Sequence, residues 1–216
     1  MKKLMVGLLI AALFCGAAFA QTPLSVSAGA RVFYNGLFTA TKVTGTDFSP
    51  YDINSFGIGA FLDATYAEIG LDFMFGNYTQ EGMPDDTTFS LNHFGFSVLG
   101  KYPVSLGTVT VFPLLGIDYQ IFIDGQAKSG GPSTDIKRSD LNTGYEDYFD
   151  AFSIVAGGGV DYNLTEKLYL RGSFTWNFKL DSEYESDARE SSDDYGIDLT
   201  LFTSGPRISL GLGYKF

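Results

Sequence analysis

The chain has almost no sulfur or imidazole chemistry, with one cysteine and one histidine in 216 residues. One cysteine cannot build an internal disulfide framework or a metal site of several thiolates, and one histidine leaves little scope for histidine-based catalysis. Charged residues are also scarce, at 18%, and 25 acids against 14 bases give a net charge of −11. This balance argues against nucleic-acid binding, because phosphates require a basic surface. No cofactor is expected.

Long hydrophobic runs are missing as well. Beyond the N-terminal leader described next, no segment approaches the roughly 18 consecutive apolar residues of a membrane-spanning helix. Aromatic residues, by contrast, make up 16% of the chain, and there are 26 glycines. A chain this apolar and aromatic is not disordered, and its length fits one domain.

The first twenty residues have the pattern of a secretory signal peptide. A basic start at 2–3 precedes an apolar stretch, Leu4–Phe14, and Ala18-Phe19-Ala20 then places small residues at the cleavage positions. This order predicts cleavage between Ala20 and Gln21, with 1–20 as the signal peptide and 21–216 as the mature domain. The alternative is a lipoprotein modified on Cys15, but Phe14 stands where a small residue is wanted.

The rest of the chain alternates between apolar and polar residues with a period of two. From Ser55 to Tyr66, apolar side chains occupy every second position, with Phe61 as the exception. Because successive side chains of a strand point to opposite faces, this pattern predicts a strand with one apolar side. The same analysis predicts eight strands, near residues 24–34, 55–66, 67–75, 94–102, 109–119, 152–162, 168–178 and 208–216.

The other face of these strands is predicted to be polar or small. It carries five acids and five bases: Arg31, Asp63, Glu68, Asp72, Lys101, Asp118, Asp161, Arg171, Arg207 and Lys215. A balanced set can pair internally, whereas charges of one sign would repel or line an ion path. We therefore expect an interior charge network whose pairs hold one another in place.

The connections alternate in length. Short turns are predicted at 66–67, 103–107 and 163–167, and long polar loops join the other strands. This arrangement is typical of an eight-stranded antiparallel transmembrane β-barrel, a meander with short periplasmic turns and long extracellular loops. Two features disturb the pattern: Pro113 should cause a bulge, and Gly205-Pro206 leaves the register of 199–203 open.

Aromatic residues are predicted at both ends of the apolar face, where interfacial girdles of a membrane barrel lie. One girdle would use Tyr66, Tyr102, Tyr162, Tyr214 and Phe216, and the other Tyr34, Phe75, Tyr119, Trp176 and Phe178. A soluble lipocalin-like barrel also alternates, but with its apolar face inward. The many glycines of the polar face instead suit a crowded interior shared with long charged side chains.

The final strand carries a resemblance to known proteins. Ile208, Leu210, Leu212, Tyr214 and the terminal Phe216 resemble the closing strand of Gram-negative outer-membrane proteins, and the whole chain is similar to the small OmpA-transmembrane, OmpX and OmpW class. The resemblance implies that Tyr214 and Phe216 form part of a signal read by the barrel-assembly machinery. It also implies an outer-membrane location, with membrane lipid around the barrel.

Three further features carry candidate chemistry. His93 would be either a hydrogen-bonded interior histidine or part of a barrel enzyme. The fourth loop holds seven carboxylates that either solvate the surface or bind Ca²⁺: Asp181, Glu183, Glu185, Asp187, Glu190, Asp193 and Asp194. The third loop, 124–148, carries Lys128, Lys137 and Arg138 and is either an ordinary surface loop or a contact for an extracellular partner.

The leading functional hypothesis is a non-enzymatic anchor with a closed, salt-bridged interior and four exposed loops. About eight strands enclose a space that side chains can fill. The alternative, implied by the resemblance to OmpW, is a narrow pore or lateral path for small solutes. A third class, an outer-membrane enzyme, depends on His93 alone.

Overall fold

The computed structural model of the chain describes residues 25–43, 46–79, 87–129, 131–141, 149–180 and 199–216. Within these ranges the chain forms β1 (Val26–Val43), β2 (Thr46–Ala64), β3 (Ala67–Thr79), β4 (Thr87–Lys101), β5 (Val104–Leu106), β6 (Val109–Ser129), β7 (Thr134–Lys137), the 3-10 helix η1 (Arg138–Asp140), β8 (Ala151–Asn163), β9 (Leu168–Leu180) and β10 (Leu199–Lys215). A search of this part of the chain finds no helix that is long and apolar enough to cross a membrane.

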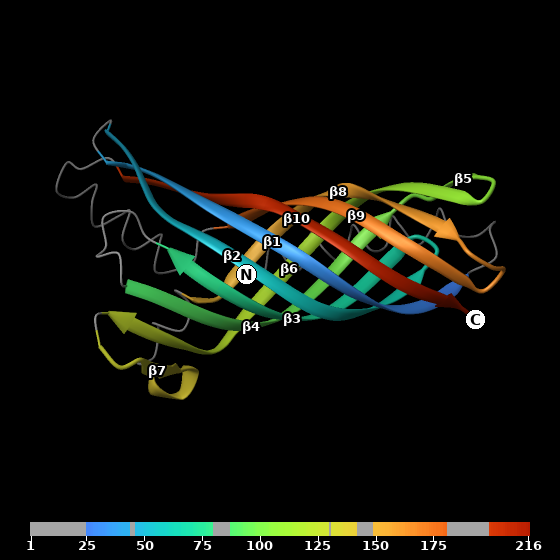
Figure 1. Cartoon of the computed structure of the whole chain (residues 1–216). Coiled ribbons are helices and arrows are strands. Elements are labelled where there is room, and N and C mark those ends of the chain that lie inside the picture. Colours follow the sequence, from blue (N-terminus) through green and yellow to red (C-terminus); the bar gives the residue numbers. More distant parts are fainter. Residues whose placement is uncertain (1–24, 44–45, 80–86, 130, 142–148, 181–198) are drawn as a thin grey trace.

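Eight long strands close into an antiparallel barrel (Figure 1). The order around the barrel is β4-β3-β2-β1-β10-β9-β8-β6, and β6 pairs back with β4. The first and last strands join, with Ala28 opposite Tyr214 and Val43 opposite Leu199. Closure gives every strand two neighbours, which is the condition for backbone polar groups to be satisfied in hydrocarbon. The predicted eight-stranded antiparallel barrel is confirmed.

The two short strands mark the two ends of the barrel. β5 lies at the end that holds the C-terminus, and β7 lies at the opposite end (Figure 1). We call these the short-turn end and the long-loop end. β5 pairs with β6 from Val104–Val111 to Leu106–Val109, so the turn predicted at 103–107 is shorter than expected. Gly107, with φ of 79°, makes this tight turn because glycine tolerates a positive φ.

Several strands are longer than the sequence pattern predicts. The ladder of β1 and β2 continues to Val43 opposite Thr46, and β6 continues to Ser129, where it pairs with both β4 and β7. Parts of the predicted first and third loops are therefore paired strand. Alternation did not reveal them because strands that extend beyond the membrane need no apolar face.

The bulge predicted at Pro113 is wrong. Pro113 stands opposite Gly158 in a continuous register with β8. On its other side, β6 leaves β4 after the pair Lys101–Leu114 and meets β5 at Val104–Val111. The missing N–H of the proline coincides with this interruption, so the ladder tolerates it without an inserted residue.

The one register shift between β4 and β6 in the described residues lies between Asn92 and His93. Asn92 is opposite Asp124, and His93 is opposite Phe122, so Ile123 is the extra residue. The Gly205-Pro206 pair causes no comparable shift. β10 runs through it, and the register that the sequence left open places Thr203 opposite Thr39.

The two faces of the barrel have opposite polarity. On β2, Phe56 and Ile58 are 66% and 59% exposed on the outside, whereas Ser55 and Asp63 are buried inside. The apolar face therefore points outward, as a bilayer requires, and the lipocalin-like alternative is wrong.

Aromatic pairs lie near both ends of this outer face. At the short-turn end the rings of Tyr66 and Tyr102 lie 6.3 Å apart, and those of Tyr214 and Phe216 lie 5.7 Å apart. Towards the other end, Tyr34 and Phe56 are 5.2 Å apart, and Tyr119 and Phe152 are 6.3 Å apart. These positions suit aromatic residues at membrane interfaces.

Candidate functional site

The register of the barrel brings distant charges into one row. A line of directly opposite residues crosses six neighbouring strands, from β8 to β3, and contains in order Asp161, Arg171, Gly211, Arg31, Gly59 and Asp72. Charged residues and glycines share this row. Long side chains can therefore lie across the positions where glycine has no side chain.

Two inward glycines show directly how this space is used. A Cβ atom on Gly59 would collide with the Asp72 carboxylate, and one on Gly70 would collide with the Arg31 guanidinium. The interior is thus close-packed around the charged groups, and small residues at these positions are a condition for that packing.

Arg171 is the centre of the ion pairs at the short-turn end. Its Nε and Nη2 each donate to the Asp161 carboxylate at 2.7 Å, and its Nη1 donates to Glu68 Oε2 at 2.5 Å. Its Nη2 also donates to Asp63, which accepts a further hydrogen bond from Lys101 Nζ at 2.5 Å. The guanidinium therefore meets three carboxylates, with the fork geometry that makes such pairs strong.

Arg31 connects these ion pairs to further ones nearer the middle of the barrel. Its Nη1 donates to Glu68 Oε1 at 2.8 Å, and its Nε and Nη2 donate to Asp72 at 2.9 and 2.8 Å. Asp72 also accepts from Arg207 Nη2 at 2.5 Å, and Arg207 Nη1 reaches Asp118 Oδ1 at 3.4 Å. The side chain of Asp72 is fully buried, so its charge depends on these arginines.

These contacts form one connected set, which we call the charged network: Arg31, Asp63, Glu68, Asp72, Lys101, Asp118, Asp161, Arg171 and Arg207. Lys215, the remaining charge assigned to the inner face, lies apart from it. Its Nζ donates to Asn163 Oδ1 at 2.7 Å and lies 5.5 Å from the ring centre of Tyr169.

Aromatic side chains inside the barrel were missed by the sequence analysis. The Arg171 guanidinium lies over the rings of Phe61, Phe112 and Tyr169, at 4.7, 5.0 and 5.2 Å from their centres. Arg207 lies 3.9 Å from the ring centre of Phe33. Cation–π contacts of this kind favour desolvated guanidinium groups. The break in alternation at Phe61 was the available signal, because it put an aromatic residue on the polar face.

Little space remains between the members of the charged network. A cavity of about 20 Å³ lies among its residues, with Arg31, Glu68, Arg171 and Arg207 in its wall. This volume holds on the order of one water molecule, since a single water needs roughly 10–15 Å³ of such space. At this level the interior is filled by side chains.

His93 lies on the inner face, nearer the long-loop end. It is 9% exposed, and its Nε2 lies 3.1 Å from the carbonyl oxygen of Phe149. A backbone oxygen therefore orients the ring in the described structure, which fits the interior-histidine alternative better than a nucleophile–base pair.

The predicted loop features are only partly within the described structure. Arg138 donates to Asp150 at 2.6 and 3.0 Å, and Lys137 stands opposite Asp124 in the β6–β7 ladder. Lys128 is exposed. The seven carboxylates of the fourth loop and the cleavage site at Ala20 and Gln21 lie outside the described residues. In the residues that are described, no cluster of His, Cys, Asp or Glu could hold a metal ion.

A closed barrel with an apolar outer face, aromatic ends and a charged interior is an outer-membrane β-barrel. Residues 24–216 match the family of OmpA-like transmembrane domains, and the chain belongs to that family. No curated protein matches the sequence.

Several solved barrels are similar in fold. Neisserial surface protein A is 17% identical, with 88% of this chain and 99% of that chain covered and a TM-score of 0.46. The attachment invasion locus protein Ail of Yersinia pestis, in complex with the heparin analogue sucrose octasulfate, is 13% identical, with 88% and 99% covered and a TM-score of 0.40. OprG of Pseudomonas aeruginosa is 13% identical, with 88% and 97% covered and a TM-score of 0.41.

Proposed function

We propose that the protein is a non-conducting outer-membrane anchor that presents its long-loop end to the cell exterior. The observation that supports this function best is the charged network, whose residues line a cavity of only about 20 Å³. Ion conduction needs a continuous water path, and opening one here would separate buried ion pairs. Breaking a buried pair costs about 3–5 kcal/mol.

The narrow-pore alternative, implied by the resemblance to OmpW, needs free space along the inner face of the barrel. The space beside Gly59 and Gly70 is occupied by Asp72 and Arg31. The glycine content therefore supports a filled interior rather than a channel.

Planar-bilayer conductance tests this proposal. The refolded mature chain, checked by its heat-dependent gel shift, should show no current steps above those of protein-free bilayers. Replacing Arg31, Asp72 and Arg207 together with alanine should create steps in refolded protein, because it removes charges and volume together. Stable steps in the unmodified protein would contradict the anchor and favour the pore.

Assembly into the membrane is proposed to use the C-terminal aromatic residues. Phe216 directly follows β10, is 76% exposed, and its ring lies 5.7 Å from that of Tyr214. Deleting Phe216 should reduce the amount of heat-modifiable barrel in outer membranes, because the assembly machinery reads this end. Refolding of the purified variant in detergent should be unchanged, and Phe216→Tyr should restore assembly. Equal amounts of barrel in cells with and without Phe216 would contradict this role.

A further inference from the structure

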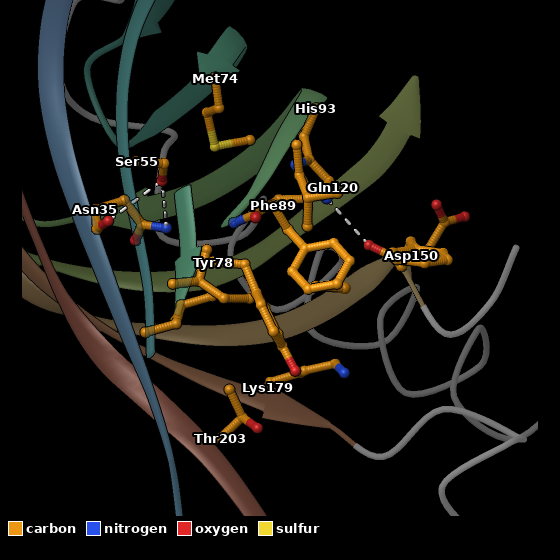
Figure 2. Close-up of a pocket in the computed structure, with 15 residues that line it drawn as sticks. Asn35, Ser55, Met74, Tyr78, Phe89, His93, Gln120, Asp150, Lys179 and Thr203 are labelled. Atoms are coloured by element: carbon orange, nitrogen blue, oxygen red, sulfur yellow. Dashed lines mark hydrogen bonds between the residues drawn. The ribbon is translucent and has the colours of Figure 1, made fainter. Parts of the chain in front are cut away.

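A larger cavity lies on the long-loop side of the charged network, and Figure 2 shows the side chains that line it. Its volume is about 260 Å³, far more than the space within the network. Each of the eight barrel strands, or the residues directly before it, contributes to the wall: the inward side chains include Asn35 of β1, Gln120 of β6, Lys179 of β9 and Thr203 of β10. The cavity is therefore a property of the closed barrel and not of one loop.

Much of the wall is apolar. The side chains that give it this character come from five strands: Leu37, Ile53, Met74, Phe89, Leu91 and Ala151. Leu37, Met74 and Leu91 are at most 4% exposed, so they are held in the lumen and kept from the bilayer. An apolar concavity with a few polar groups is the usual form of a small-molecule site.

The polar side chains of the wall are engaged with protein partners. Ser55 donates to the Asn35 carbonyl oxygen at 3.2 Å, and the hydroxyls of Thr203 and Thr39 lie 2.9 Å apart. Gln120 donates to Asp118 of the charged network at 2.7 Å. Because these neutral groups already have hydrogen-bond partners within the protein, they do not require a charged or strongly polar ligand.

The charged side chains of the wall also have interaction partners within the protein. The Asp150 carboxylate accepts hydrogen bonds from Arg138 and, at 2.9 Å, from the backbone N–H of Phe122. Lys179 is engaged in an interaction of its own, and His93 is held by the Phe149 carbonyl oxygen. A charged ligand would have to compete with these contacts, so the wall favours an uncharged one.

We propose that this cavity binds a small, uncharged, largely apolar molecule that enters from the long-loop end. An apolar cavity of about 150 Å³ binds benzene, so a volume of about 260 Å³ accommodates an aromatic or short alkyl compound of about ten non-hydrogen atoms. Binding would cover apolar surface that otherwise faces the lumen. The inference goes beyond the anchor function and rests on the cavity alone, so a conducting barrel would not overturn it.

The test uses 5-fluoroindole as the probe and the full mature chain in phospholipid nanodiscs, so that no detergent tail fills the site. Fluorine NMR titration should give saturable binding to the unmodified protein. Ala151→Leu places a larger side chain in the cavity and should weaken binding at least about tenfold, in line with the loss from misfitted apolar contacts. Ala156→Leu on the same strand is the matched control, since Ala156 pairs with Leu115 of the outer face, and it should bind as tightly as the unmodified protein.

Three results would overturn the proposal. Equal probe signals in the unmodified protein, the Ala151→Leu variant and empty nanodiscs would mean partition into lipid only. Tighter binding of the anion indole-2-carboxylate would contradict an uncharged ligand, and equal saturable binding to the Ala151→Leu variant would place the site elsewhere. If Ala151→Leu lacks the heat-dependent gel shift, Ile53→Phe fills the cavity from β2 and replaces it.

Discussion

Replacing Arg171 with alanine should lower the free energy of unfolding by about 3–5 kcal/mol, because it leaves buried carboxylates without their partner. Arg171 contacts Asp63, Glu68 and Asp161, and its side chain is 5% exposed. Arg171→Lys should recover only part of the loss, since one ammonium cannot reproduce the forked contacts of a guanidinium. Urea unfolding of the barrel in lipid vesicles, followed by the fluorescence of the single tryptophan, Trp176, measures both values.

The matched control for Arg171 is Arg138→Ala. Arg138 also pairs with a carboxylate, that of Asp150, but its side chain is 34% exposed. Only the guanidinium is open to solvent, since the Asp150 carboxylate is 5% exposed, but that carboxylate keeps its hydrogen bond from the Phe122 N–H when Arg138 is removed. Arg138→Ala should therefore lose clearly less stability than Arg171→Ala, because a partly exposed pair is screened by solvent. If the two variants unfold at the same midpoint, the charged network does not stabilise the barrel more than a partly exposed pair does.

Replacing Gly59 with alanine should cost about 1–3 kcal/mol, the usual penalty for added volume in a packed interior. The new methyl group would overlap the Asp72 carboxylate, which pairs with Arg31 and Arg207. Relief requires the carboxylate to move, and that lengthens its ion pairs. The same urea titration measures the loss.

Gly172→Ala is the control for Gly59. Gly172 lies on β9, and a Cβ atom there would meet only Val160 and Leu210 at ordinary distances of 3.6 and 3.9 Å. The substitution should be neutral or slightly stabilising, because alanine restricts the unfolded chain more than glycine. Equal effects of the two substitutions would mean that the loss at Gly59 reflects backbone freedom and not the collision with Asp72.

The charged network and the cavity divide the lumen into two parts. Around the network, ion pairs and aromatic rings fill the space. Towards the long-loop end, side chains such as Met74 and Leu91 line a cavity of about 260 Å³. Gln120 joins the two parts, since it lines the cavity and donates to Asp118 of the network. A ligand in the cavity would thus lie next to the filled part of the lumen, which would block its passage to the short-turn end.

Much of the candidate site was predictable because it depends on strand periodicity. The inner-face positions of Asp63, Asp72 and Arg171 followed from alternation alone. Their partners did not, since pairing depends on register between strands that are distant in sequence. Glu68 and Arg171, for example, are 103 residues apart along the chain and meet only through barrel closure.

Three other features could not be predicted, because the sequence signal for each was weak or was compatible with two structures. Phe61 broke the alternation, but only the folded barrel shows that it covers the Arg171 guanidinium. Pro113 predicted a bulge, whereas the interruption between β4 and β5 accommodates it instead. The cavity was not predicted, because its wall combines inward side chains from strands across the whole barrel.

The sequence by itself determined the class of fold, the strand count and the outward direction of the apolar face. These properties follow from a period of two, since a slip of one residue would turn every apolar side chain into the lumen. Only the tertiary structure decided which charges pair, where the strands end and where free volume remains. Those outcomes depend on closure of β1 against β10 and on side-chain packing across the lumen, which bring together residues from opposite ends of the chain.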